Sequence, residues 1–151
     1  LAKFYGFIKP VEEQLMEDEA LNHMGLDMGI RMKSKLLEDD LIHLGMTPDE
    51  ITLLPPCSRL PELRTRAQIL GYLYVLEGST LGGQVITKQL MKFLPLGPES
   101  GSRYFYAYGQ ETKLRWTEFR EVLLSNATED SDVVINSAIE TFRLLDAWIR
   151  E

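Results

Sequence analysis

Three glycines and a serine lie within six residues of one another, in a segment that otherwise has the pattern of a helix. Gly78, Ser79, Gly82 and Gly83 interrupt apolar residues that recur at helical spacing across residues 69–93. Each glycine in a helix interior costs about 1 kcal/mol relative to alanine, so bare backbone must serve a purpose there. It permits a kink, a close helix crossing or a ligand lying flat against the main chain. If a ligand lies there, this segment is the functional site.

Length, composition and charge exclude several classes of protein. The 151 residues, 44% of them hydrophobic, predict one globular domain with a sizeable core. With 16 basic and 23 acidic residues the net charge is −7, which argues against a nucleic-acid partner because such binding needs a basic surface. A single cysteine, Cys57, excludes an intrachain disulfide framework and a cysteine-rich zinc site. No apolar run has the length of a membrane span and no signal peptide is recognisable, so we expect a cytoplasmic protein without a membrane partner.

The rest of the chain is patterned as helices joined by short breaks, with no convincing alternating strand and no internal repeat. An all-α bundle is therefore the predicted fold class. Helices are predicted at residues 4–15, with a kink or restart at Pro10, at 30–44, from Thr47-Pro48, from Pro61 to the break at Leu96-Gly97-Pro98, at 104–124 and at 134–149.

The glycine segment resembles a known family. Residues 71–86, Gly-Tyr-Leu-Tyr-Val-Leu-Glu-Gly-Ser-Thr-Leu-Gly-Gly-Gln-Val-Ile, are similar to the distal helix of haem oxygenases, particularly the bacterial type associated with bacteriophytochromes. Further segments resemble the family in the same order: Phe4-Tyr5 with Pro10-Val11-Glu12, Arg31-Met-Lys33 with residues 36–41 and Leu44-Gly45, Leu54-Pro55 to Leu63-Arg64, Tyr108-Gly109 with Trp116, and Thr141-Phe142 with Trp148. The resemblance implies a single helical domain over residues 1–151, a haem oxygenase-like bundle whose distal helix is kinked at the glycines.

The resemblance also implies a reaction. Haem oxygenases hold haem, which is both substrate and cofactor, between a proximal helix that supplies a histidine to the iron and the kinked distal helix. With O2 and electrons from a ferredoxin or a reductase, they cleave haem at a meso carbon and release biliverdin, CO and ferrous iron. For the bacterial type, the biliverdin is expected to supply a bacteriophytochrome with its chromophore.

The distal segment carries the expected catalytic and haem-contacting residues, Gly78, Ser79, Gly82 and Gly83. In the family, glycines let the backbone lie against the porphyrin face. Ser79 stands where many members have an aspartate that anchors a water network. A hydroxyl can donate and accept a hydrogen bond but supplies no charge, so water is expected to carry the network here.

Four other residues are candidate haem contacts. Haem propionates need cations at the rim of the pocket, and Arg31, Lys33 and Arg143 are the candidates. Phe142 is the candidate for packing against the haem edge. The competing interpretations are a solvated helix surface for the cations and ordinary core for the aromatic ring.

The resemblance places the iron-ligating histidine on a helix that precedes the Phe4-Tyr5 segment, so we expect the sequence to lack the family's first, proximal helix. Neither His23 nor His43 aligns with that histidine. A surface or helix-capping role is predicted for both, and no metal ligand is assigned.

Ordinary structural roles are expected at three further places. Glu77, beside the glycines, is predicted to cap or pair locally, and the run Glu38-Asp39-Asp40 to form a solvated face. The aromatic cluster within residues 104–108 is predicted to pack in the core, with a pocket wall as the alternative.

Two alternatives to a haem oxygenase remain open at this stage. One is a non-catalytic protein that binds haem or another tetrapyrrole on the same scaffold. The other is a helical enzyme resembling the thiaminase-like or quinone-cofactor-synthesis proteins, since fold alone does not decide function. Cys57 lies in a Pro-Pro turn, a poor context for the nucleophile of a thiaminase. Haem cleavage is therefore the predicted function.

Overall fold

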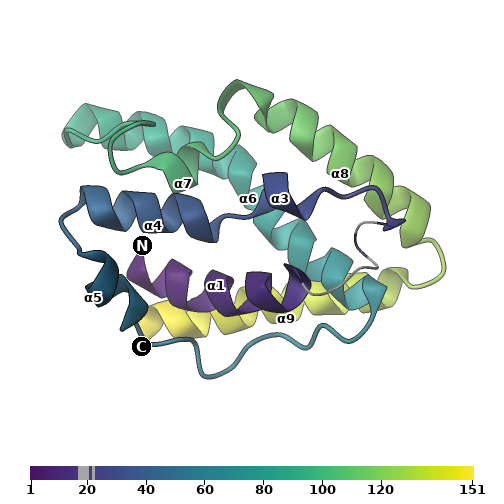
Figure 1. Cartoon of the computed structure of the whole chain (residues 1–151). Helices are drawn as coiled ribbons and strands as arrows, with labels where there is room; N and C mark the ends of the chain where they lie inside the picture. The colour runs from purple at the N-terminus through teal and green to yellow at the C-terminus, as the bar shows by residue number, and fades with distance from the viewer. Residues whose placement is uncertain (17–20, 22) are drawn as a thin grey trace.

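The computed structural model describes residues 1–16, 21 and 23–151, and in this part of the chain helices are the only regular secondary structure (Figure 1). They are α1 (Ala2–Met16), α3 (Met28–Arg31), α4 (Ser34–His43), α5 (Pro48–Thr52), α6 (Arg66–Phe93), α7 (Arg103–Tyr106), the 3-10 helix η1 (Gly109–Glu111), α8 (Thr112–Asn126) and α9 (Ser131–Arg150). The all-α prediction is confirmed. None of the helices in the described residues has the length and apolarity to cross a membrane.

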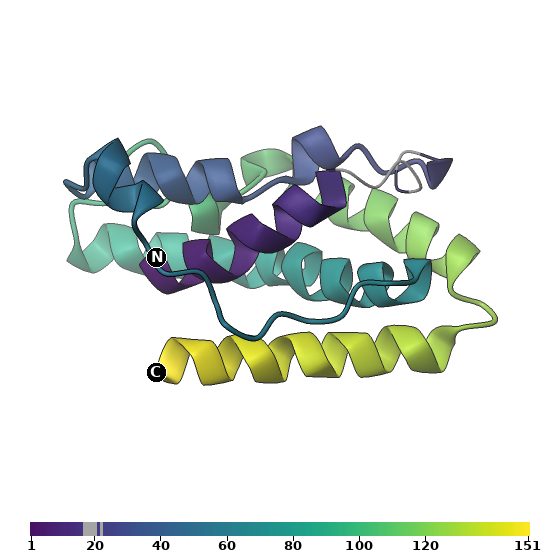
Figure 2. The ribbon, with the colours of Figure 1, turned by 60° about the horizontal axis from the view of Figure 1, so that its bottom comes forward.

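The long helix α6 organises the bundle. It packs against α7, α8 and α9, whereas α1 packs between α4 and α9, as Figure 2 shows with α9 along one side of the molecule. Buried Phe7, Leu37, Tyr72 and Phe119 bring α1, α4, α6 and α8 into one core. The indole Nε1 of Trp148 donates to the carbonyl oxygen of Lys3 at 2.7 Å, which ties the last helix to the first.

Helix α6 begins later than its sequence pattern predicts. The start at Pro61 is wrong, because a capping box places the first turn at Arg66. The backbone N–H of Gln68 donates to the Thr65 hydroxyl at 3.2 Å, and the Gln68 side chain accepts from the N–H of Thr65 at 3.0 Å. The similar box predicted at Thr47 is confirmed, and Pro10 lies within α1 without ending it.

The single helix predicted over residues 30–44 is divided into α3 and α4. Glu12, buried on α1, accepts from the backbone N–H groups of Lys33 at 2.5 Å and of Ser34 at 2.9 Å. A carboxylate from another helix thus caps the start of α4, and the preceding turn is released from the helix.

The helix predicted over residues 104–124 is also divided. Asp40 is fully buried and accepts from the backbone N–H groups of Arg103 at 2.8 Å and of Tyr104 at 2.9 Å, so its prediction as part of a solvated face is wrong. These bonds cap the start of α7. After α7, Ala107 and Gly109 have positive φ angles of 46° and 57°, which a continuous right-handed α-helix does not accommodate. The resulting turn places α7 across α6 before α8 begins.

Candidate functional site

A cavity of about 300 Å³ opens on the glycine segment of α6. Its lining comprises Leu76, Ser79, Thr80, Gly82, Gly83 and Ile86 from α6, and Phe4, Lys33, Tyr104, Phe105 and Leu145 from four other places in the fold. Its volume lies at the lower end of the range for small-molecule sites, roughly 300–1,000 Å³. Ser79 and Gly82 are exposed, so the cavity is open to solvent along this face of the helix. Because most of the lining is apolar, a largely apolar ligand fits it.

The three glycines of the segment have different surroundings. A Cβ at Gly82 would meet no other atom within 4 Å, because this backbone faces the open cavity. A Cβ at Gly83 would fall on the carbonyl oxygen of Phe105, so this glycine permits the close approach of α7. A Cβ at Gly78 would lie 3.7 Å from the ring of Trp116, which is an ordinary contact. Bare backbone therefore faces the open cavity at Gly82 and permits close helix packing at Gly83.

Replacing Gly83 with alanine is expected to lower the free energy of unfolding by about 1–3 kcal/mol, since the methyl group meets backbone that cannot move cheaply. Urea denaturation followed by circular dichroism measures this. Gly78→Ala is the matched control and is expected to leave stability unchanged or raise it by up to about 1 kcal/mol. Equal stability of the two variants would refute the packing role of Gly83.

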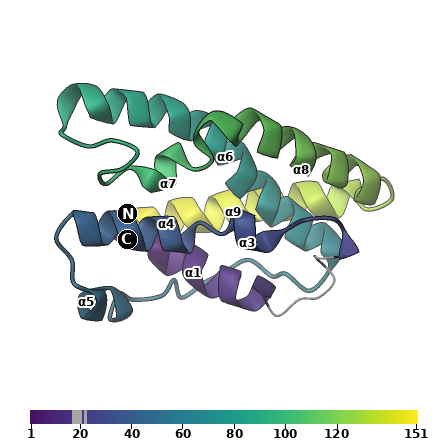
Figure 3. The same cartoon turned by 45° about the horizontal axis from the view of Figure 1, so that its top comes forward.

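The hydroxyls of Ser79 and Thr80 are turned back onto their own helix. Ser79 donates to the carbonyl oxygen of Val75 at 2.6 Å, and Thr80 donates to that of Glu77 at 2.6 Å. Such bonds bend helices, as do Gly–Ser pairs, and α6 changes direction along its length in Figures 1 and 3. With its proton committed to the helix, the Ser79 hydroxyl at the cavity wall is left to act as a hydrogen-bond acceptor, which is also how an ionised carboxylate acts.

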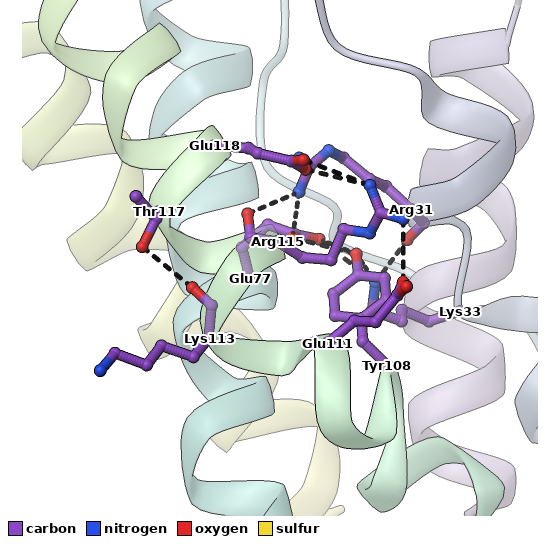
Figure 4. Close-up of polar contacts among 9 residues, drawn as sticks. All are labelled: Arg31, Lys33, Glu77, Tyr108, Glu111, Lys113, Arg115, Thr117 and Glu118. Carbon is purple, nitrogen blue, oxygen red and sulfur yellow. Dashed lines mark hydrogen bonds and ion pairs between the residues drawn. The ribbon is translucent and has the colours of Figure 1, made fainter.

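A buried group of charged and polar side chains adjoins the cavity. We call Arg31, Lys33, Glu77 and Tyr108 the Glu77 cluster (Figure 4). Glu77, 1% exposed, accepts from Arg31 Nη1 at 2.5 Å, from Lys33 Nζ at 3.2 Å and from the Tyr108 hydroxyl at 2.8 Å. Its partners lie 46, 44 and 31 residues away in sequence, so the prediction that Glu77 caps or pairs locally is wrong.

Lys33 has all three of its ammonium donors committed. Besides Glu77, Nζ reaches the carbonyl oxygen of Arg31 and the hydroxyl oxygen of Tyr108, each at 2.6 Å. Burial lowers the pKa of Lys33, and the neighbouring Glu77 carboxylate opposes this effect. Burial, reinforced by Glu77, raises the pKa of Tyr108, which therefore remains a neutral hydroxyl. The ammonium is held inside the cluster while the residue still forms part of the cavity wall.

Aromatic rings form the wall opposite α6. The ring of Phe4 lies 5.3 Å from that of Tyr104 and 6.3 Å from that of Phe105, measured between centroids. Both α7 residues line the cavity, so the pocket wall that the sequence offered as an alternative is present. Burial is the main cause that raises the pKa of Tyr104. No local pattern distinguishes these rings from core residues, since their position depends on the turn at Ala107.

The remaining predicted contacts lie outside the lining of the cavity. Arg31 is buried between Glu77 and Glu118, whose Oε2 is 3.5 Å from Nη2. Phe142, 53% exposed, and Arg143, also exposed, lie on α9. Phe142 is one turn before Leu145, a residue that lines the cavity. The structure thus brings Ser79, Gly82, Gly83 and Lys33 together at the cavity. Gly78, Arg31 and the two α9 residues are not part of its lining.

The histidines and the cysteine do not line the cavity. His43 is the last residue of α4 and is exposed, and His23 is also exposed. Cys57 is buried, and its Sγ donates to the carbonyl oxygen of Arg59 at 3.2 Å. The chemistry of the cavity walls therefore comes from hydroxyls, bare backbone and aromatic rings.

Two comparisons with known proteins point to the same family. A sequence model of the family described as "Heme oxygenase" matches residues 1–151. A protein named "Heme oxygenase" from Xanthomonas campestris pv. campestris (strain 8004) is 32% identical over 137 residues, which cover 89% of this chain and 77% of the relative. No solved structure matches the chain. The chain belongs to the haem oxygenase family, and its function is the oxidative degradation of haem.

Proposed function

We propose that haem binds in the cavity with its porphyrin face against α6 and is cleaved there to biliverdin. The observation that carries the proposal is the bare backbone at Gly82, which lines the cavity and beside which an added Cβ would meet no atom within 4 Å apart from the neighbouring backbone of its own helix. A flat macrocycle needs a flat wall, and any side chain at this position would stand between ring and helix. Phe4, Tyr104 and Phe105 supply an aromatic surface on the opposite side.

Ser79 and Thr80 are the proposed polar contacts inside the cavity. Their donated protons are used by α6 itself, so their oxygens are available to accept hydrogen bonds from water beside the haem. Haem, when bound, supplies the iron at which O2 is activated for attack on a meso carbon. The chain's part is to hold the ring against α6 and to order water at the hydroxyls. Phe142 and Arg143, which are exposed on α9 in the turn before Leu145, are proposed contacts for the outer edge of the haem.

Three finer assignments extend this proposal to the protein's surroundings. The electrons come from a ferredoxin or a reductase, because cleavage of haem with O2 requires an electron donor. The biliverdin supplies a bacteriophytochrome, because the distal segment over residues 71–86 is similar to that of the associated bacterial type. The acidic composition, with a single cysteine, fits a cytoplasmic location.

Haem titration of the full-length protein tests the proposal. We expect a Soret band that saturates at one haem per chain and then decays, after a reductant is added in air, as biliverdin absorption grows. A stable Soret band without turnover would instead indicate a haem-binding protein, the alternative on the same scaffold. The absence of any Soret band would refute haem binding in the cavity.

Ser79→Ala is expected to keep haem binding and to lower the rate of biliverdin formation by less than about tenfold, equivalent to about 1.4 kcal/mol. The reason is that Thr80 and water remain to carry the hydrogen bonds. Single-turnover absorption spectra measure the rate. Ser125→Ala is the matched control, since Ser125 donates to the carbonyl oxygen of Glu121 at 2.8 Å on the exposed face of α8. Complete loss of turnover with haem still bound would contradict the view that water substitutes for the serine.

A further inference from the structure

Among the residues that line the cavity, Lys33 is the one that carries a charge. It is 2% exposed, and all three ammonium donors are bonded inside the Glu77 cluster (Figure 4). A propionate would therefore find no donor there without breaking an existing bond. A fixed, poorly solvated charge beside a cavity acts at a distance instead, through the potential it creates.

Two buried carboxylates contact Lys33. Glu77 is 3.2 Å from Nζ and also holds Arg31, while the Glu12 carboxylate accepts the backbone N–H of Lys33. Four buried charged groups, two cations and two carboxylates, thus lie together, and of these Lys33 is the residue that also lines the cavity. The partly exposed Glu118 and Arg115 pair with each other beyond Arg31, at 3.1 Å. The Lys33–Glu77 ion pair therefore adjoins the cavity wall, of which Lys33 forms a part.

We propose that the Lys33–Glu77 ion pair sets the electrostatic potential of the cavity. Lys33 stabilises negative charge on a ligand that is held beside Ser79, and Glu77 moderates this effect. This inference rests on the proposed function, in which a negative charge develops on oxygen at the haem. Both residues are positioning residues in this role, because they touch each other and not the reacting atoms. The potential needs no movement during the reaction, since hydrogen bonds to each other, to Arg31 and to Tyr108 fix the two charged groups.

Azide binding to the ferric haem complex at neutral pH tests the proposal, with imidazole as the neutral control ligand. Lys33→Met removes the cation and is expected to weaken azide binding about two- to fourfold, the effect of one charge about 10 Å away at an effective dielectric constant of about 40–80. Glu77→Gln removes the anion and is expected to tighten azide binding by a similar factor. The affinity for imidazole is expected to stay the same in every variant.

Glu77→Gln leaves two buried cations without their partner and can fail to fold, so the double variant Lys33→Met/Glu77→Gln is measured against Lys33→Met. We expect the second substitution to restore the azide affinity that the first removes. The inference is overturned if both substitutions change the azide affinity in the same direction. It is also overturned if a substitution changes the affinities for azide and for imidazole equally, because either result indicates a structural role. If the wild-type protein has a normal Soret band, the proposed haem binding stands whatever the azide affinities are. If the wild-type protein shows no Soret band, both the proposed function and this inference are overturned.

Discussion

Gly82→Leu is expected to abolish haem binding while the protein stays folded. The new side chain would project into the cavity, because no atom lies within 4 Å of a Cβ at this position. We expect the haem dissociation constant to rise at least about 100-fold, equivalent to about 2.7 kcal/mol. The helix itself is expected to gain up to about 1 kcal/mol, since leucine is a better helix former than glycine. Titration followed by the Soret band measures the first effect, and urea denaturation the second.

Val85→Leu is the matched control for this variant. Val85 lies on the same helix, is 60% exposed and does not line the cavity, so an added leucine there should leave haem binding unchanged. Unchanged haem affinity in Gly82→Leu would mean that the ring does not lie against this backbone, and the proposed site would have to be abandoned. Loss of helical signal in Gly82→Leu would contradict the open surroundings of Gly82.

Glu77→Ala is expected to lower the free energy of unfolding by about 3–5 kcal/mol, because it leaves Arg31 and Lys33 buried without their counter-charge. A typical domain is stable by only about 5–15 kcal/mol, so much of the protein would be unfolded or easily unfolded by urea. Equilibrium denaturation followed by tryptophan fluorescence and circular dichroism measures the loss.

Glu118→Ala provides the comparison for a carboxylate that is 40% exposed and also pairs with Arg31. Its effect is expected to stay within about 1 kcal/mol, since solvent screens the pair. Equal losses for the two variants would show that burial of Glu77 does not govern its contribution. The triple variant with Arg31→Met and Lys33→Met is expected to recover stability relative to Glu77→Ala, because no buried charge is then left unpaired.

Local pattern was sufficient to recognise the helices and some of their ends, although the start of α6 was missed despite the local capping box of Thr65 and Gln68. The capping box at Thr47 has its partner three residues away, and it is present as predicted. The breaks at residues 32–33 and 107–109 could not be recognised in this way. The first depends on Glu12, which caps α4 from 21 and 22 residues away in sequence. The second follows α7, whose start is capped by Asp40 from 63 and 64 residues away, and it contains the positive φ angles of Ala107 and Gly109.

For function, the residue types of one short segment were sufficient to indicate the family and its ligand. Glycines cost helix stability, so a run of them within an apolar helix signals a contact with bare backbone, and this signal is local. Which of these glycines faces open space could not be recognised from local sequence. Only the packing of α7 separates Gly83, which supports Phe105, from Gly82, which faces the cavity. Likewise, Glu77 has no special neighbours in sequence, and its role arises because folding brings Lys33 and Tyr108 to it from 44 and 31 residues away.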